Sequence, residues 1–353
     1  MHSGTSDGER KMKKRGIICA GSIIVDQLKL LDAYPAPSTL ANISEMSLAP
    51  GGLVCNCIQD LARMDTELPL YAVGIVGDDK QGRFILDLLS SYKNIDISGI
   101  KKSGQTSFTD VMYEKHNNTR TFFQFAGANE YFDESCLELD DYEGLLHIGY
   151  ILLLKALDAP DAEYGTKLAR LLAGAQARGL KTSIDIVSEN SARFSSIVVP
   201  ALKYTDYCII NELEAERTTG IQLSSADGII EENLPAAFRA LHEYGVGEWI
   251  VIHSKLESYG VDSQGNYVRA TVYGVPHEEI ASTTGAGDAF CSGVLLGAFR
   301  GYTLDEAMKL GTLAANCSLL TVGASDGISE IAEMEKQAAA WSQPEIRVGS
   351  IAL

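Results

Sequence analysis

The sequence predicts an α/β fold of three layers, in which helices cover both faces of a central, mostly parallel sheet and a small β-sheet forms a lid. From residue 145 onward, short buried apolar runs alternate with stretches of helical periodicity, the pattern of a parallel sheet. Earlier, near 104–126, a hairpin pattern interrupts this alternation and indicates the lid. With 353 residues, 46% of them hydrophobic, the chain can bury a large core.

The N-terminal part of the chain supplies the first strands and the lid. Residues 1–15 are polar and are expected to form a disordered tail. The apolar run 16–25 predicts a buried strand. The lid is expected from two insertions, near 30–50 and 104–126, with an asparagine-rich turn at 116–118. Further elements are expected as helices at 56–64 and 82–92 and a strand at 70–76.

The C-terminal part continues the strand–helix alternation. Strands are expected at 145–148, 182–186, 207–210 and 249–253. Helices are expected at 162–178, 212–219, 234–244, 286–300 and 304–320, with a β-rich stretch at 258–276. The main α/β domain is therefore placed at 16–335, and residues 336–353 are expected to be a C-terminal tail.

Composition excludes several classes of partner. The formal net charge of −18 disfavours nucleic acid and anionic membranes. Seven scattered cysteines, an odd number, predict reduced thiols in the cytoplasm. Basic residues at 10–15 precede an apolar run as in a signal peptide, but Asp26 ends that run early. No apolar stretch approaches the roughly 18 residues that span a bilayer.

The strongest local signal for chemistry is the run from Thr283 to Phe290, TTGAGDAF. Gly285, Ala286 and Gly287 lead into an amphipathic helix, so their N–H groups and the helix dipole can hold an anion such as a transferring phosphoryl group. Asp288 in the first turn can accept a proton from an attacking hydroxyl. The alternative is an ordinary glycine-rich turn followed by an Asp that the dipole favours.

Four motifs together resemble those of the PfkB, or ribokinase-like, carbohydrate kinases. The Gly-Ala-Gly-Asp run resembles the second signature of that family, and Gly51-Gly52 leading to Asn56 resembles the first. Asn211-Glu212-Leu213-Glu214 resembles its Asn-x-x-Glu element, and the run VGIVGDD at 73–79 also matches. The resemblance extends over about residues 16–325. It implies a ribokinase-like αβα domain with a β-sheet lid.

The resemblance also implies roles for individual residues. Asp288 is the implied base, and the N–H groups of Gly285, Ala286 and Gly287 form the implied anion hole. Mg²⁺ and the phosphates of ATP are held by Asn211 and Glu214 through water. The other implied contacts are to substrate through Asp26, Gly52, Asn56 and Arg120, and to ATP through Asn211, Gly260 and Asn316.

Each assignment has a structural alternative. Asp26 can simply end a strand, Asn56 can cap a helix, and Glu214 can be a first-turn carboxylate that the helix dipole favours. Asn316 can satisfy a buried contact between helices, and Arg120 can be an ordinary surface residue of the lid. Two histidines in apolar strands, His147 and His253, are expected in the core or in loops, not as metal ligands.

The sequence departs from the family pattern at three places. Ser282 stands where many relatives have an Asp that helps form a monovalent-cation site, so the need for K⁺ is in doubt and activity is expected to depend only weakly on it. The ATP loop after residue 253 keeps one glycine, Gly260, instead of two. The Asp-x-Asn-x-x-Arg region matches only loosely, from Asp185 to Arg193.

The expected reaction is ATP-dependent phosphorylation of a hydroxyl on a small sugar. Relatives that take phosphorylated sugars place Lys where this chain has Leu53, so an unphosphorylated ketose or pentose is expected. Leu53, Val54 and the lid aromatics Phe108, Phe122 and Phe123 leave a nucleoside kinase open as the alternative. A catalytically weak sugar-binding relative is a third possibility. The expected protein partner is a second copy of the chain, which forms a homodimer through the lid.

Overall fold

The computed structural model describes residues 13–353 except 115, 117–118, 188–192 and 227. Its main element is a ten-stranded sheet in the order β18-β17-β16-β15-β12-β11-β8-β1-β4-β5. All pairs from β15 to β5 are parallel, and β16, β17 and β18 join antiparallel at one edge. The strands are β1 (Lys14–Gly21), β4 (Leu70–Val76), β5 (Ile95–Lys102), β8 (Tyr142–Ile151), β11 (Lys181–Ile186), β12 (Tyr207–Asn211), β15 (Trp249–His253), β16 (Glu257–Asp262), β17 (Asn266–Thr271) and β18 (Ile346–Ser350).

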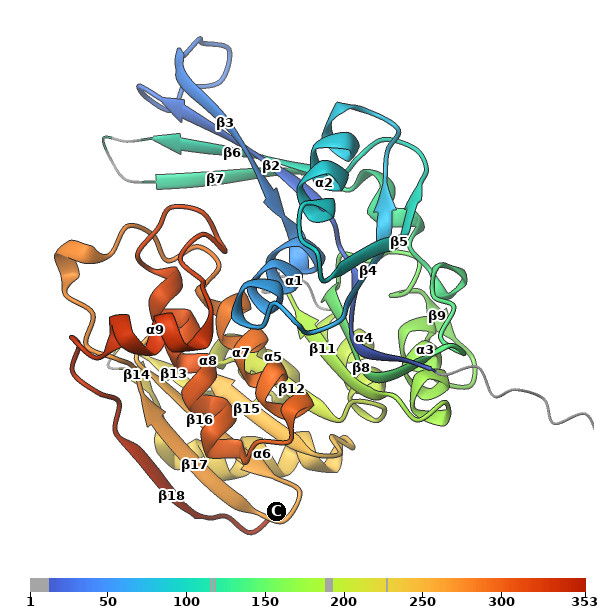
Figure 1. Ribbon diagram of the computed structural model, residues 1–353, viewed down its shortest axis with the longest axis vertical. Coiled ribbons are helices and arrows are strands. Elements are labelled where there is room, and N and C mark those ends of the chain that lie inside the picture. Colours follow the sequence, from blue (N-terminus) through green and yellow to red (C-terminus); the bar gives the residue numbers. More distant parts are fainter. Residues whose placement is uncertain (1–12, 115, 117–118, 188–192, 227) are drawn as a thin grey trace, which may run out of the picture.

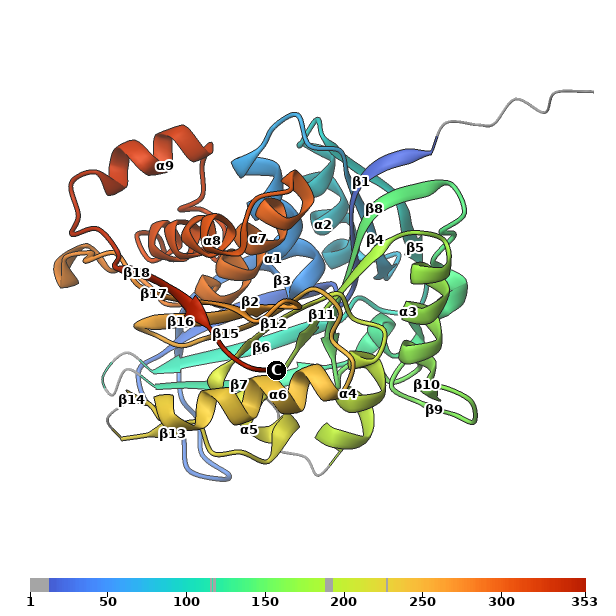
Figure 2. The same ribbon diagram turned by 90° about the horizontal axis from the view of Figure 1, so that it is seen from below.

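Helices cover both faces of this sheet (Figures 1 and 2). Two hydrophobic clusters, one on each side of the sheet, form the core, because buried parallel strands carry apolar side chains on both faces. The helices of one face are α1 (Gly52–Met64), α2 (Lys80–Ser90), α7 (Ala286–Arg300), α8 (Leu304–Ser318) and α9 (Ile331–Ala338). Those of the other face are α3 (Lys167–Ala177), α4 (Phe194–Leu202), α5 (Glu212–Thr219) and α6 (Leu234–Glu243).

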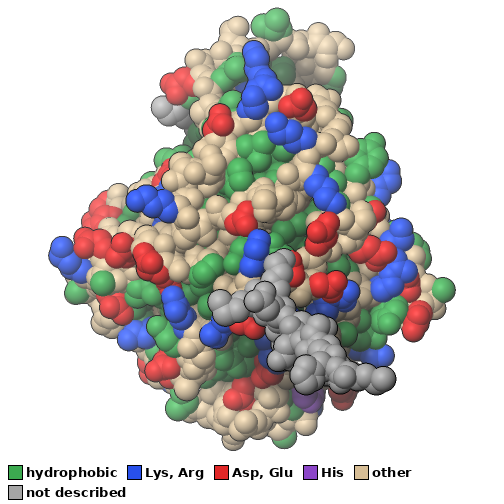
Figure 3. Space-filling model, turned by 45° about the vertical axis from the view of Figure 1, so that its right-hand side comes forward, with side chains coloured by type: hydrophobic (Ala, Val, Ile, Leu, Met, Phe, Trp, Pro, Cys, Tyr) green, Lys and Arg blue, Asp and Glu red, His purple; other side chains and the backbone are tan. Residues whose placement is uncertain are grey.

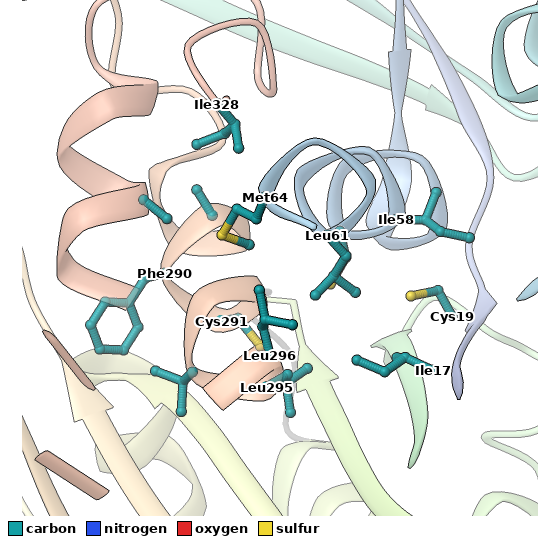
Figure 4. Close-up of a cluster of buried hydrophobic side chains, with 14 of the residues drawn as sticks. Ile17, Cys19, Ile58, Leu61, Met64, Phe290, Cys291, Leu295, Leu296 and Ile328 are labelled. Carbon is teal, nitrogen blue, oxygen red and sulfur yellow. The ribbon is translucent and has the colours of Figure 1, made fainter. Parts of the chain in front are cut away.

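Helices α1 and α7 pack directly on each other, which matters because the expected site residues lie at their N-terminal ends. Figure 4 shows Leu61 and Met64 of α1 facing Cys291 and Leu295 of α7. All four side chains are buried. Burying a large apolar side chain contributes about 1.5–3 kcal/mol, so this contact holds the two helix starts in a fixed relation.

The lid is a separate four-stranded sheet in the order β3-β2-β6-β7, projecting from one end of the molecule (Figure 1). Its strands are β2 (Ile24–Leu31), β3 (Ile43–Gly51), β6 (Phe108–Glu114) and β7 (Thr119–Phe125). The pairing register aligns Asp26 with Thr109, and Tyr113 with Arg120. Because side chains alternate between faces along a strand, Asp26, Arg120 and Phe122 share one face of the lid. Phe108, Phe123 and Phe125 lie on the other face, with Met46 and Leu48.

Minor elements complete the chain. Two short ribbons are formed by β9 (Pro160–Asp161) with β10 (Gly165–Thr166) and by β13 (Ser224–Ser225) with β14 (Gly228–Ile229). Short 3-10 helices lie at Gly127–Tyr131, Glu134–Cys136, Glu231–Asn233 and His277–Glu279.

The structure changes several expected boundaries. The run 16–25 is divided between β1 and β2, because the chain leaves the main sheet for the lid after Gly21. Residues 336–353 are not a tail, since they complete α9 and supply β18, which pairs with β17. The helix expected at 162–178 begins only at Lys167, after the β9–β10 ribbon. Most of the expected N-terminal tail and two residues of the lid turn, 117 and 118, lie outside the described residues.

The surface carries charges of both signs. Figure 3 shows acidic and basic side chains interspersed over one face. Within the described part of the chain, no helix has the length and apolar character needed to span a lipid bilayer.

Candidate active site

The expected catalytic residues meet at the carboxyl ends of the parallel strands, where α/β sheets commonly bind ligands. A cavity of about 230 Å³ lies there, lined by ends of β8, β11, β12 and β15 and by the start of α7. A larger open groove, about 1110 Å³, lies beside the C-terminal ends of α1 and α2 and contains none of the expected site residues. The smaller cavity is lined by Tyr150, Asp185, Ile186, Val187, Ile209, Asn211, Glu214, His253, Gly285, Gly287, Asp288 and Cys291.

The glycine-rich loop before α7 has the backbone form that an anion site requires. Gly285 has φ of 84°, the left-handed conformation that favours glycine. A Cβ at this position would also lie 2.5 Å from the carbonyl oxygen of Ala324. Ala286 and Gly287 then open a 15-residue helix, whose first N–H groups have no partner within the helix. The loop can therefore hold a phosphoryl group through backbone N–H groups and the helix dipole.

Asp288 lies in the first turn of α7 and is held by two neutral donors. Nδ2 of Asn56 donates to Oδ2 of Asp288 at 2.9 Å. The Tyr150 hydroxyl lies 2.8 Å from Oδ1 and 2.9 Å from Oδ2. Burial raises the pKa of Asp288, and the hydrogen bonds from Asn56 and Tyr150 oppose that rise. The carboxylate is thus oriented from α1 and from β8 at once.

Two more expected residues, Gly52 at the start of α1 and Asp26 in β2, lie at the base of the lid. Gly52 begins α1 with φ of 79°, and a Cβ there would lie 2.6 Å from the carbonyl oxygen of Ser22. Asp26 lies beside the adjoining Gly51, where any added Cβ would meet its carboxylate. Burial raises the pKa of Asp26 to about 6, with a smaller contribution from the charge of Asp288 and an opposing hydrogen bond from Thr109.

The lid reaches the glycine-rich loop 283–287, named the phosphoryl loop below, through Arg120. Nη1 of Arg120 donates to Oγ1 of Thr284 at 2.7 Å, although the two residues are 164 positions apart. The guanidinium also lies 5.5 Å from the ring centroid of Tyr113. Both Arg120 and Thr284 are exposed. A cation therefore stands next to the loop that begins α7.

Asn211 and Glu214 form a capping box at the start of α5. Oδ1 of Asn211 accepts from the N–H of Glu214 at 2.9 Å, and Oε2 of Glu214 accepts from the N–H of Asn211 at 3.0 Å. Nδ2 of Asn211 also donates to Oε1 of Glu214 at 2.7 Å. Glu214 is buried, so it is not the solvated first-turn carboxylate that one reading of the sequence allowed.

Most of the chain matches the pattern of a known protein family. Residues 14–331 match the pattern described as pfkB family carbohydrate kinase. The chain belongs to the pfkB family of carbohydrate kinases. Together with its relatives, this membership makes it a sugar or nucleoside kinase of the ribokinase type.

Individual pfkB-family relatives are distant but cover most of the chain. An adenosine kinase from Schizophyllum commune is 23% identical over 337 residues, covering 90% of this chain and 91% of the relative. A 5-dehydro-2-deoxygluconokinase from Geobacillus thermodenitrificans is 24% identical over 299 residues, which cover 81% of this chain and 83% of the relative. The structure of Arabidopsis thaliana ribokinase complexed with ribose and ATP superposes with a TM-score of 0.74 at 18% identity, covering 92% of this chain and 98% of that one. The fold is therefore that of the ribokinases.

Three residues singled out from the pfkB-like sequence pattern, Gly260, Asn316 and Ser282, do not line the cavity. Gly260 lies within β16, where an added Cβ would meet Met308 of α8, and it does not line the cavity. Oδ1 of the buried Asn316 accepts from the backbone N–H of Tyr273 at 3.2 Å, which links α8 to the segment after β17. The Ser282 hydroxyl accepts from the N–H of Thr284 at 3.1 Å and so supports the phosphoryl loop.

Three cavity residues were not predicted as site residues. Tyr150, Asp185 and His253 come from the carboxyl ends of β8, β11 and β15; Asp185 and His253 begin the two loosely matching stretches of the pfkB-like pattern, and Tyr150 belongs to none of its motifs. Burial raises the pKa of Asp185 well above its usual range, and the charges of Asp288 and Glu214 add to this. Burial lowers the pKa of His253 to about 4, so this imidazole is neutral near pH 7. His147, by contrast, is a buried core residue beside Ser183, as expected.

Proposed function

We propose that this kinase transfers the γ-phosphoryl group of ATP to a hydroxyl of a small unphosphorylated sugar, a ketose or pentose, with Asp288 as the general base. The observation that carries the proposal is the position of Asp288, one residue after Gly287, in the first turn of the helix that the phosphoryl loop opens. A base beside an anion site is the arrangement that in-line phosphoryl transfer needs.

Each bond change in this reaction has a matching group in the site. The substrate hydroxyl gives its proton to a carboxylate oxygen of Asp288 while its oxygen forms a bond to the γ-phosphorus. The bond from that phosphorus to the β–γ bridging oxygen breaks, and ADP leaves with the bonding electrons. Backbone N–H groups at Gly285, Ala286 and Gly287 hold the charge on the equatorial oxygens. Arg120, bonded to Thr284 beside the loop, adds a positive charge from the lid.

Mg²⁺ is part of the proposal, held through water by Asn211 and Glu214. Oxygen donors suit this ion, and its reluctance to lose water favours indirect contacts. Both residues line the same cavity as Asp288. Among the described residues there is no cluster of three or more His, Cys, Asp or Glu side chains arranged to bind a metal directly. When bound with ATP, the ion neutralises charge on the phosphates.

The charges near the substrate side support an unphosphorylated acceptor. Leu53 is buried, and its Cδ1 lies against Gly149, so position 53 offers neither charge nor polar contact. Lys29 of the lid forms an ion pair with Asp110 at 2.5 Å, on the face opposite Asp26. A sugar phosphate needs a cation to bind it, and Arg120, the cation on the face of Asp26, is already bonded to Thr284 at the loop that opens α7. Asp26 instead offers a carboxylate that accepts hydrogen bonds from sugar hydroxyls.

A nucleoside kinase is the second candidate, favoured by the similarity to an adenosine kinase over nine-tenths of the chain. The aromatic side chains of the lid give less support to a nucleoside kinase. Only Phe122 of the three aromatic residues first considered shares the face of Asp26, since Phe108 and Phe123 point to the other face. A catalytically weak sugar-binding protein is the third candidate. The complete set of Asp288, Asn211 and Glu214 argues against it.

Release of ADP, measured with Mg·ATP and a panel of neutral ketoses and pentoses, their phosphates and nucleosides, tests this proposal. We expect the highest kcat/KM with a neutral sugar and a clear advantage of fructose over fructose 6-phosphate. A consistent advantage of the phosphorylated partners in matched pairs would contradict the proposed substrate class. A higher kcat/KM with a nucleoside would replace it by the second candidate.

We also propose a homodimer formed through the outer face of the lid. Met46, Leu48 and Phe123 lie on that face, and 71%, 52% and 51% of their surfaces are exposed. Exposed apolar side chains gathered on one sheet face are typical of an interface.

The seven cysteines are all free and buried, which supports a reducing, cytoplasmic setting.

A further inference from the structure

Tyr150 is the closest neighbour of the catalytic base that the proposed mechanism leaves without a role. It lies at the carboxyl end of β8, between β1 and β11, and lines the same cavity as Asp288. Its hydroxyl is within hydrogen-bond distance of both carboxylate oxygens, at 2.8 and 2.9 Å. Asn56 binds only Oδ2. Tyr150 is therefore the one neighbour, among the described residues, with a hydrogen bond to Oδ1.

The surroundings of Asp288 favour its protonated, inactive form. Carboxyl groups face it from the lid, from α1 and from β11, and its negative charge contributes to a raised pKa at each of them, namely Asp26, Asp60 and Asp185. Cys291 and His253 also line the cavity, the first with a raised pKa and the second neutral near pH 7.

Two neutral hydrogen-bond donors thus oppose this unfavourable field. A hydrogen bond to a carboxylate stabilises the charged form and lowers the pKa of the group. Burial and the charges of Asp288 and Asp185 raise the pKa of Tyr150 well above 10. The phenol consequently stays neutral near pH 7 and can only donate its proton to Asp288. It cannot replace Asp288 as the base.

We propose that Tyr150 is a positioning residue that keeps Asp288 ionised and fixes the plane of its carboxylate for proton transfer. This inference rests on the proposed function, because it assumes that Asp288 is the base. Tyr150 does not itself take the substrate proton. Tyr150 binds the carboxylate from β8, and Asn56 binds it from α1.

The test is the pH dependence of kcat at saturating sugar, where protonation of Asp26 no longer limits binding. Tyr150→Phe removes the hydroxyl and keeps the ring. A hydrogen bond to a charged group contributes enough that its loss shifts a pKa by about one unit. We expect the acid limb of the profile to move up by about one pH unit, with kcat on the plateau within a few-fold of the wild type.

Two further variants show whether the shift of the acid limb depends on the hydrogen bond of Tyr150. Replacing Tyr150 by 3-fluorotyrosine makes the phenol a stronger donor, so the acid limb is expected to move to lower pH. Tyr71→Phe makes the same chemical change in β4, outside the cavity, and is expected to leave the profile unchanged. An unchanged acid limb in both Tyr150 proteins would overturn the inference. So would an equal loss of kcat at every pH, which indicates a structural role alone.

A parallel assay of Asp288→Asn separates this inference from the proposed function. If Asp288→Asn is inactive while the Tyr150 proteins keep the wild-type limb, only the role of Tyr150 fails. If Asp288→Asn turns over at the wild-type rate, the assignment of the base itself fails.

Discussion

The raised pKa of Asp26 predicts that sugar affinity falls steeply in mild acid. The carboxyl lies on the inner face of the lid, against Gly51, and burial raises its pKa from 3.8 to about 6. Only the ionised form offers two charged acceptor oxygens to sugar hydroxyls, because protonation removes the charge and converts one oxygen into a donor. Affinity should therefore be full above pH 6 and should be lost as the pH falls through 6.

The size of the effect follows from simple titration. With a pKa of about 6, the dissociation constant is multiplied by about 1.1 at pH 7 and by about 11 at pH 5, so it rises about tenfold between them. Isothermal titration calorimetry with the best sugar and a non-hydrolysable ATP analogue measures this directly, and it excludes effects on turnover.

The matched control is Asp26→Asn, which keeps the shape and removes the titration. Its affinity should be weaker at pH 7 and almost flat down to pH 5. The reasoning would be refuted by a wild-type affinity that stays constant over this range, or by an Asp26→Asn protein that keeps the wild-type slope.

Three other predictions concern the loop, the lid and the cation. Arg120→Ala should lower kcat by about 10- to 100-fold with an unchanged melting temperature, because the side chain is exposed and acts through Thr284 and the phosphoryl group. The control Arg347→Ala, on the edge strand β18, should match the wild type, and equal effects of the two changes would contradict the role of Arg120. Activity should change little when K⁺ is replaced by tetramethylammonium at constant ionic strength, because Ser282 supplies a neutral hydroxyl already bonded to Thr284; a many-fold loss restored by K⁺ would show that a cation site remains. Light scattering should give a dimer mass for the wild type and a monomer mass for Met46→Glu, whereas a monomeric wild type would exclude the lid interface.

The sequence allowed the fold and part of the site to be predicted because several residues lie within one continuous motif. The helix 286–300 was predicted with the bounds that the structure gives α7, so Gly285 and Asp288 needed only local reasoning. The partner of Asp288 on α1, Asn56, was accessible through the family resemblance. Strands β4 and β15 were likewise predicted with the bounds that the structure gives them, because each is a short buried run between turn residues.

The remaining site residues depend on the order of the strands in the sheet. Tyr150 and Asp185 both lie near Asp288 only because β8 and β11 are adjacent strands of the sheet, an order that periodicity does not encode. A polar side chain at the carboxyl end of a buried strand was the available signal for both. Strand β18 was missed because it is a short edge strand that is largely exposed. Gly260 was singled out for ATP binding, and in the structure its missing side chain also makes room for Met308.

The most direct test of the central assignment is a single-turnover measurement on Asp288→Asn. With enzyme in excess over Mg·ATP and the best sugar, rapid quenching follows formation of the sugar phosphate, and a separate titration measures ATP affinity. The account predicts that the rate of transfer falls by a factor of about 10² or more, the scale of general-base catalysis, while ATP affinity stays within a few-fold of the wild type. A transfer rate close to that of the wild type would contradict the assignment of Asp288 as the base.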